Sequence, residues 1–170
     1  FADAKKVVVV GGAHGGFLAA VLNREPTAKG VLFDQPQVVE SAGATLEAAG
    51  VASRVERVGG SFFESVPAGG DVYLLKHILH DWNDAECVAI LERVRAAMAP
   101  GAKVVVVEML ITDDGPPSPA PLMDLNMLVM LTGRERTAEE FGALFAKAGL
   151  KLTGVTPTHS PMTVIEAVAG

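Results

Sequence analysis

The sequence predicts an α/β fold with a doubly wound, mostly parallel sheet, and three observations support this class. Four short, unbroken apolar runs recur along the chain, at 7–10, 31–33, 72–75 and 104–107. Such runs are typical of strands that are buried on both faces of a parallel sheet. Helical patterns alternate with the runs, which implies right-handed crossovers with helices on both faces. The 170 residues, 49% of them hydrophobic and 20% charged, suffice for one globular domain with its own core.

The first strand is followed by the glycine-rich segment GGAHGG at 11–16, which opens a helical segment. Nucleotides bind at this position in open α/β sheets, because glycine permits a tight turn and the helix N-terminus offers free N–H groups. Asp34 closes the next strand, roughly 20 residues on, where a carboxylate can accept the ribose hydroxyls. With Ala13 in its middle, the loop matches neither glycine fingerprint cleanly, so a tight turn without a ligand remains open.

Two helices are predicted from their capping signals. Asn83 with Glu86, and Thr137 with Glu140, fit the capping box that begins a helix. Apolar residues at helical spacing follow each box, and the second helix is predicted to end at Gly149.

The last third of the chain supplies the remaining elements. Residues 113–121, DDGPPSPAP, are predicted to form a surface excursion that leads into a methionine-rich helix at 122–131. Segments 151–155 and 162–168 are predicted as two strands that close the sheet.

Charge and cysteine content argue against several classes of partner and setting. A net charge of -6 and the lack of any basic run argue against nucleic acid and anionic membranes as partners. No apolar stretch approaches the length of a membrane span. A single cysteine, Cys87, rules out an internal disulfide, so we expect a reduced, cytoplasmic setting.

The segment LKHILHDWND at 75–84 carries the residues with the clearest chemistry. Its two histidines, His77 and His80, are spaced one helical turn apart. By itself the pattern allows a shared metal site, one general base beside a packed neighbour, or two structural side chains.

With this segment the chain resembles the catalytic domain of small-molecule O-methyltransferases of the plant caffeate/isoflavone type and their bacterial natural-product relatives. The likeness covers nearly all 170 residues and includes the glycine loop, VLFDQPQVV, GSFFESVP, LKHILHDWND, PGAKVVVVEML, DLNMLVML and GRERTAEEF. It implies a seven-stranded, Rossmann-like sheet of the class I methyltransferase fold, with residues 1–170 as the catalytic domain. It also implies S-adenosylmethionine as cofactor, a small hydroxylated and usually aromatic substrate, and no metal. An N-terminal dimerisation domain would lie outside this chain and make the full-length protein a homodimer.

The resemblance also implies roles for individual residues. It places the general base at His80 and two flanking acids at Glu108 and Glu135. Cofactor contacts are expected at Gly11, Gly12, Gly15, Asp34, Gln35, Ser61, Phe62 and Lys76, and substrate contacts at Asp81, Met123 and Met127. The chain departs from the family pattern on the cofactor side, where Val9 replaces an acid, Ala13 a glycine and Ser61 an aspartate.

Methyl transfer to a phenol needs a base, because a phenol has a pKa of about 10 and is mostly protonated at neutral pH. A neutral histidine, with a reference pKa of about 6.5, fits that role. A carboxylate on the other ring nitrogen would fix the tautomer and stabilise the imidazolium that forms. Glu108 and Glu135 are both expected at the rim of the sheet near His80, and the sequence does not say which one contacts it.

Three other functions remain open. A nicotinamide-dependent oxidoreductase would use the glycine loop and Asp34, but it leaves the HDW and RERT segments unexplained. A metal-dependent hydrolase would use His77 and His80 as paired ligands, although the sequence shows no third ligand at a telling distance. The third is a homologue on the same fold that binds without methylating.

Overall fold

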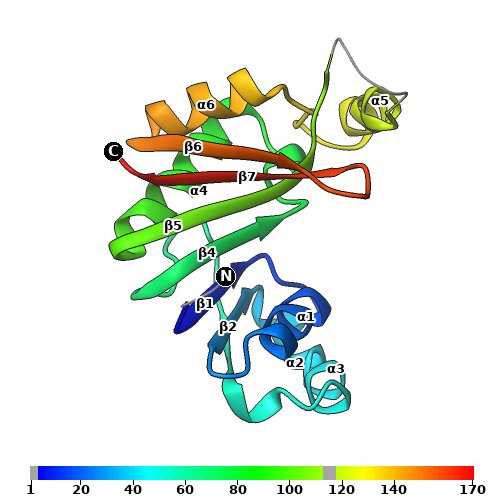
Figure 1. Ribbon diagram of the computed structural model, residues 1–170. Coiled ribbons are helices and arrows are strands. Elements are labelled where there is room, and N and C mark those ends of the chain that lie inside the picture. Colours follow the sequence, from blue (N-terminus) through cyan, green and yellow to red (C-terminus); the bar gives the residue numbers. More distant parts are fainter. Residues whose placement is uncertain (1–3, 113–117) are drawn as a thin grey trace.

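A computed structural model describes residues 4–112 and 118–170 of the chain, and a seven-stranded sheet runs through it (Figure 1). The strand order is β3-β2-β1-β4-β5-β7-β6. Strands β1 to β5 run parallel, whereas β7 runs antiparallel to both of its neighbours. The bounds are Lys6–Val10 (β1), Lys29–Asp34 (β2), Val55–Gly59 (β3), Gly70–Lys76 (β4), Met98–Met109 (β5), Leu150–Pro157 (β6) and Met162–Ala169 (β7).

Helices cover both faces of the sheet and divide the core into two clusters. The helical elements are α1 (Gly16–Arg24), α2 (Pro36–Ser41), α3 (Gly43–Ala48), η1 (Ala52–Arg54), η2 (Leu79–Asp81), α4 (Asp84–Ala97), α5 (Ala120–Met130) and α6 (Ala138–Lys147). Helices α4 and α6 pack on one face, and α1 to α3 on the other, beside β1 and β2 (Figure 1). Successive residues of a strand point to opposite faces, so the valines at 7–10 divide evenly between the two clusters. None of the helices within residues 4–112 and 118–170 combines the length and the apolar composition of a membrane span.

The predicted fold class and the seven-stranded, mostly parallel sheet are confirmed. Both capping boxes form: the side chains of Asn83 and Thr137 accept the N–H groups of Glu86 and Glu140 at 3.1 and 3.2 Å. The methionine-rich helix begins at Ala120, slightly before the predicted start at 122. The excursion predicted at 113–121 falls partly on residues 113–117, which lie outside the described residues.

Strand β3 is not marked by an apolar run in the sequence. It lies at the edge of the sheet, pairs only with β2, and has no buried residue. An edge strand of this kind needs no apolar run, because water covers most of its side chains. The run at 104–107 marks only the buried centre of β5, which spans Met98–Met109.

The sheet topology brings the candidate motifs to one edge. In a parallel sheet the carboxyl ends of the strands meet on the same side, where α/β proteins bind their ligands. The glycine loop follows β1, Asp34 ends β2, and LKHILHDWND begins at the end of β4. Glu108 lies one residue before the end of β5, so the fold sets all four segments side by side.

Candidate active site

The turn after β4 is held in place by contacts from distant parts of the chain. Arg136 is fully buried, and its guanidinium donates to the carbonyl oxygens of Leu79 at 2.9 Å and Trp82 at 2.8 Å. It also donates to Asp84 Oδ1 at 2.8 and 3.0 Å. Gly133 packs directly on this turn, because a Cβ placed there would collide with the carbonyl oxygen of His80. The position of the turn is therefore fixed by residues of the 133–136 segment.

His80 lies at the centre of the turn and is 7% exposed. Its Nδ1 is 2.8 Å from Glu135 Oε1, and a proton on Nδ1 makes this a hydrogen bond that fixes the ring. Its Nε2 lies 3.3 Å from Oδ1 of the partly exposed Asp81. Burial lowers the pKa of His80, but the hydrogen bond to Glu135 and the charges of Glu108 and Asp81 outweigh it, so the net shift is upward.

Glu108 supports the same turn through its other neighbours. It is fully buried, and its Oε1 accepts the N–H groups of Ile78 at 3.0 Å and Leu79 at 3.1 Å. Among the described residues, no hydrogen-bond partner reaches its second oxygen, Oε2, which lies 3.8 Å from His80 Nδ1. Burial raises the pKa of Glu108 to about 7. Of the two acids near His80, Glu135 makes the direct contact, and Glu108 holds the backbone beneath the ring.

His77 shares this neighbourhood without joining the hydrogen-bonded pair. Its Nδ1 lies 3.8 Å from Glu108 Oε2, and its side chain is 32% exposed. Burial, followed by the charges of Lys76 and His80, lowers its pKa. Its backbone φ of 54° is in the left-handed region, where the chain leaves β4. The structure thus places Glu108 as a third metal-ligand type beside the two histidines, which sequence spacing had not shown.

The glycine loop and Asp34 form one connected unit. Asp34 Oδ2 accepts the N–H of Ala13 at 2.8 Å, and its Oδ1 accepts the N–H of Gln35 at 2.7 Å. Gly11 and Gly15 adopt φ values of 72° and 81°, and a Cβ on either would meet a neighbouring side chain. Ala13 also has a positive φ, 47°, so the loop keeps a turned backbone although its middle residue is not glycine.

Two cavities are lined by predicted cofactor residues. One, of about 390 Å³, lies beyond the end of β2 and brings together four predicted cofactor residues with two further aromatic rings; its lining includes Asp34, Gln35, Ser61, Phe62, Phe63 and Trp82. The rings of Phe62, Phe63 and Trp82 pack edge to face, with centroids 4.8 to 5.9 Å apart.

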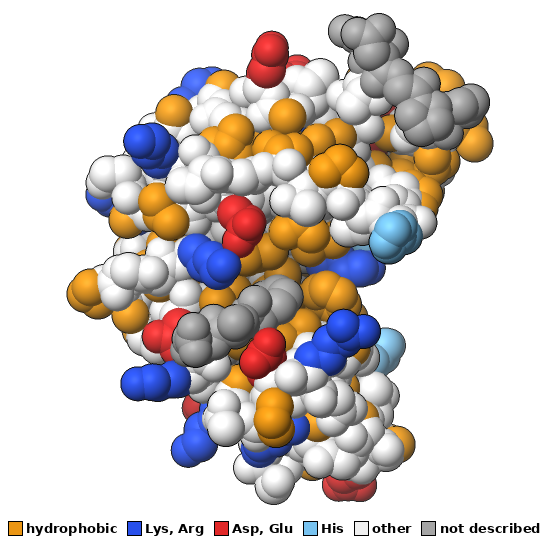
Figure 2. Space-filling model, in the orientation of Figure 1, with side chains coloured by type: hydrophobic (Ala, Val, Ile, Leu, Met, Phe, Trp, Pro, Cys, Tyr) orange, Lys and Arg blue, Asp and Glu red, His pale blue; other side chains and the backbone are white. Residues whose placement is uncertain are grey.

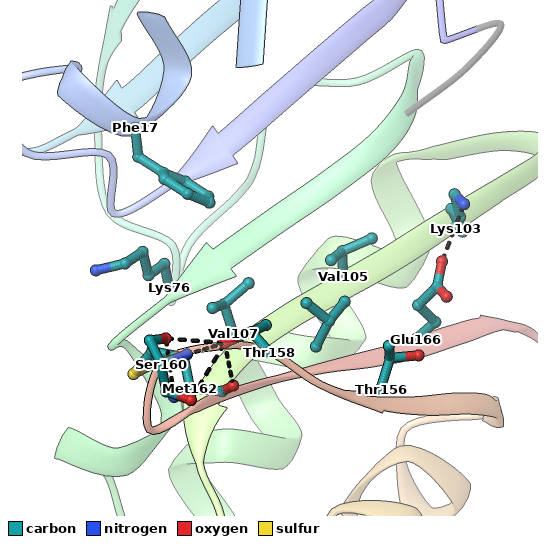
Figure 3. Close-up of a pocket in the computed structure, with 11 residues that line it drawn as sticks. Phe17, Lys76, Lys103, Val105, Val107, Thr156, Thr158, Ser160, Met162 and Glu166 are labelled. Atoms are coloured by element: carbon teal, nitrogen blue, oxygen red, sulfur yellow. Dashed lines mark hydrogen bonds and ion pairs between the residues drawn. The ribbon is translucent and has the colours of Figure 1, made fainter. Parts of the chain in front are cut away.

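The other cavity, of about 460 Å³, lies over the β5–β7–β6 side of the sheet, where Figure 2 shows a hollow. Figure 3 shows Phe17 and Lys76 at one end of this cavity and the ion pair of Lys103 and Glu166 at the other. Lys76 is the only predicted cofactor residue on its lining in the described chain, so the predicted cofactor residues do not all face one cavity.

Helix α5 is linked to the site through Asp124, and several of its apolar side chains are exposed. Asp124 accepts the backbone N–H of Glu135 at 2.9 Å, which links the helix to the partner of His80. Met127 is buried and Met123 half-buried. The outward residues of α5 are exposed; they are Leu122, Leu125, Leu128, Val129 and Met130, which lie at the corner where Figure 2 shows hydrophobic side chains.

The chain is similar to known proteins over most of its length. A family model described as the O-methyltransferase domain matches residues 1–151. The chain belongs to the O-methyltransferase domain family. Its relatives include a phenazine O-methyltransferase of Lysobacter antibioticus, 44% identical over 98% of this chain and 49% of that protein. An 8-amino-8-demethylriboflavin N,N-dimethyltransferase of Streptomyces davaonensis is 39% identical over 92% of this chain and 45% of that protein.

A solved structure of this kind carries ligands. The O-methyltransferase of neocarzinostatin biosynthesis, in complex with S-adenosylmethionine and 2-hydroxy-5-methyl naphthoic acid, superposes with a TM-score of 0.87 at 36% identity. The match covers 96% of this O-methyltransferase domain and 48% of that chain. The domain thus spans about half the length of the relatives it matches.

Sequence reasoning missed three residues of this O-methyltransferase domain that hold the site together. Arg136 and Gly133 flank Glu135 in the GRERT segment, and Asp124 precedes it on α5. The RERT segment points to its acid, Glu135, whereas its second arginine, Arg136, is the residue that hydrogen-bonds to the turn. Nothing in the local pattern marks Gly133, since the backbone it packs on lies more than 50 residues away in sequence.

Proposed function

We propose that this domain moves a methyl group from S-adenosylmethionine to a hydroxyl, usually phenolic, of a small aromatic molecule, without a metal. The observation that carries the proposal is the buried contact between His80 Nδ1 and Glu135 Oε1 at 2.8 Å. That contact fixes the ring and leaves Nε2 beside the partly exposed Asp81, on the side from which a substrate hydroxyl can approach. Family membership, and the phenazine and naphthoic acid relatives, support the same reaction class.

The chain's own residues fit the cofactor in two ways. The carboxylate of Asp34 stands at the end of β2, where a ribose is held, and each of its oxygens retains acceptor capacity beyond one N–H. The cavity beside it offers the rings of Phe62 and Trp82 to a flat base, and Gln35 and Ser61 line the same space. At Gly11, Gly12 and Gly15 the space that a Cβ would fill is taken by Ile78, Leu32 and Leu46, so these glycines let the loop pack closely on the fold, and Lys76 borders the neighbouring cavity. When bound, S-adenosylmethionine supplies an electrophilic methyl group.

His80 then acts as the general base. With Nδ1–H donated to Glu135, the lone pair on Nε2 accepts the proton of the substrate hydroxyl. The imidazolium that forms is stabilised by Glu135 in contact and by Glu108 at 3.8 Å. In the protein without substrate, Asp81 is 3.3 Å from Nε2, so we propose that the substrate hydroxyl takes the place of this carboxylate.

The acceptor is expected to lie against α5. Asp124 ties this helix to Glu135, Met127 on it is buried and Met123 is half-buried, and the flexible thioether suits contact with a flat ring. An amine acceptor is the second candidate, because a relative that is 39% identical is named as an N,N-dimethyltransferase. A homologue that binds without methylating is the third, since Ala13 and Ser61 alter the cofactor side.

We further propose that this domain works within a longer, cytoplasmic protein that forms a homodimer. The domain spans about half the length of its relatives. On α5, five apolar side chains are each at least 60% exposed, which is the kind of surface that another protein segment covers. The single cysteine, Cys87, is a buried free thiol, as a reducing compartment allows.

Calorimetric titration with S-adenosylmethionine and, separately, with NAD tests the cofactor. We expect binding of S-adenosylmethionine alone, and binding of NAD alone would overturn the proposal. His80→Ala is expected to abolish methyl transfer to a phenolic acceptor while cofactor affinity stays unchanged. His77→Asn serves as the matched control and should keep the activity. A mild effect of His80→Ala together with a severe effect of His77→Asn would refute the role given to His80.

A further inference from the structure

Beside His80 and Glu108 lies a second histidine, His77, which the proposed methyl transfer does not use. His77, His80 and Glu108 each offer one ligand atom, and these three atoms lie within 4.8 Å of one another; Nδ1 of each histidine approaches Glu108. Glu108 Oε2 is 3.8 Å from each of the two ring nitrogens. Within the described part of the chain, no hydrogen-bond partner satisfies this buried oxygen. A buried carboxylate oxygen without a partner is costly, and here it points between two imidazoles.

We propose that this cluster is an inhibitory site for a divalent transition-metal ion of the zinc class. Imidazole nitrogen and carboxylate oxygen are ligands that Zn²⁺ binds at about 2.0–2.2 Å. In a tetrahedral site such ligands are separated by roughly 3.4 Å, so Glu108 Oε2, at 3.8 Å from each Nδ1, needs to shift only slightly, while His80 Nδ1 must exchange its contact with Glu135 for the ion. The solvent-exposed side of His77 provides the entry path, since its side chain is 32% exposed and the other two are buried.

The inhibition rests on the proposed role of His80, whereas the binding does not. The base needs its proton on Nδ1, donated to Glu135, and its lone pair on Nε2. A metal on Nδ1 requires the lone pair there and drives the proton to Nε2. The substrate-facing nitrogen then becomes a donor and no longer accepts the hydroxyl proton. The ion thus blocks the reaction by selecting the wrong tautomer, without filling the cofactor cavity.

A substitution of His77 can remove metal binding without changing the groups proposed for methyl transfer. It contributes a ligand atom to the cluster, but within the described part of the chain it forms no hydrogen bond or ion pair with Glu135 or Asp81. Asparagine removes the imidazole and tolerates the φ of 54° at this position better than most residues do. Glycine tolerates it fully and provides a second variant. His159, exposed in the β6–β7 connection, offers the matched control His159→Asn.

The test uses Zn²⁺ and Co²⁺ as the probes, with the chain in a buffer that does not chelate metal. Calorimetry should show one Zn²⁺ bound by the unaltered protein and by His159→Asn, and binding at least about tenfold weaker in His77→Asn and His77→Gly. The visible absorption of bound Co²⁺ should show tetrahedral coordination and should vanish in the His77 variants. Methyl transfer by the unaltered protein should be inhibited by Zn²⁺ and restored by a chelator, while His77→Asn should keep its rate at the same Zn²⁺ concentration.

Equal Zn²⁺ affinity in the unaltered protein and the His77 variants would overturn the site, as would no binding at all. Equal inhibition of the unaltered protein and His77→Asn would overturn the inhibitory role. A protein that binds Co²⁺ through His77 but never methylates would keep the site and remove the proposed function. Loss of activity in His80→Ala, together with no metal binding by the unaltered protein, would keep the proposed function and remove the metal site. The failure of the metal site and the failure of the proposed function are therefore distinguishable.

Discussion

Replacing Glu108 with glutamine is expected to stabilise the fold at alkaline pH and to change it little at acidic pH. The amide oxygen of glutamine can accept the N–H groups of Ile78 and Leu79 as Oε1 does, so the turn keeps its support. The substitution removes only the charge. Because Glu108 is fully buried and one of its oxygens has no partner in the described chain, that charge is a burden on the folded state.

The magnitude follows from linkage. Burial raises the pKa of Glu108 from 4.5 to about 7, so the folded protein holds a proton that the unfolded chain has already lost. Its contribution to stability therefore falls as pH rises through this window, by roughly 2–3 kcal/mol between about pH 5 and about pH 8. Glu108→Gln should escape this loss, and for a domain of this size the gain at the higher pH corresponds to roughly 5–10 °C in Tm.

Thermal and urea unfolding of both proteins at the two pH values measure the effect. Glu92→Gln, on the exposed side of α4, is the matched control and should show no pH-dependent difference. The reasoning is refuted if Glu108→Gln is less stable than the unaltered protein at the higher pH. A stability difference that is identical at both pH values would refute it too, since it would then come from packing and not from charge.

Three other outcomes are expected. Because the pKa of His80 is raised, kcat/KM should fall with decreasing pH through a value above the histidine reference of about 6.5; a pH–rate profile tests this, and a flat profile contradicts it. Ala13→Gly should stabilise the protein by about 1 kcal/mol in urea unfolding, because alanine is strained at a φ of 47°, and a loss of stability would show the strain to be absent. Cys87 is fully buried and burial raises its pKa to about 12, so alkylation should proceed only as fast as the protein unfolds; rapid labelling under native conditions would contradict this.

The sequence predicted those parts of the fold in which burial leaves a pattern. Strands buried on both faces give unbroken apolar runs, and helix starts give capping boxes, so β1, β2, β4, β5, α4 and α6 could all be placed. The edge strand β3 leaves no such pattern because none of its five residues is buried. Helix α5 was found from its apolar composition, but its exposed face could not be told from a core face without the structure.

In the site too, local motifs locate residues, whereas the contacts between them depend on long-range packing. His80, Glu108 and Glu135 could be located from their motifs, whereas which acid contacts His80 depends on where the 133–136 segment packs. That packing joins residues about 55 positions apart, and no local periodicity encodes it. The third metal-ligand type beside His77 was missed for the same reason, since Glu108 comes from β5 and not from the histidine segment.

The contacts around the turn after β4 show why its geometry belongs to the whole edge of the sheet. Its backbone is unfavourable by itself, with a positive φ at His77 and carbonyl groups that turn inward at Leu79 and Trp82. The Arg136 guanidinium donates hydrogen bonds to those carbonyl oxygens, and Glu108 accepts the N–H groups of Ile78 and Leu79. Gly133 leaves the space that the turn occupies. Arg136 and Glu108 are themselves buried, and their charged groups would be costly without the turn. The turn and its supports therefore stabilise each other, and the position of the His80 ring depends on contacts from the 133–136 segment and from β5.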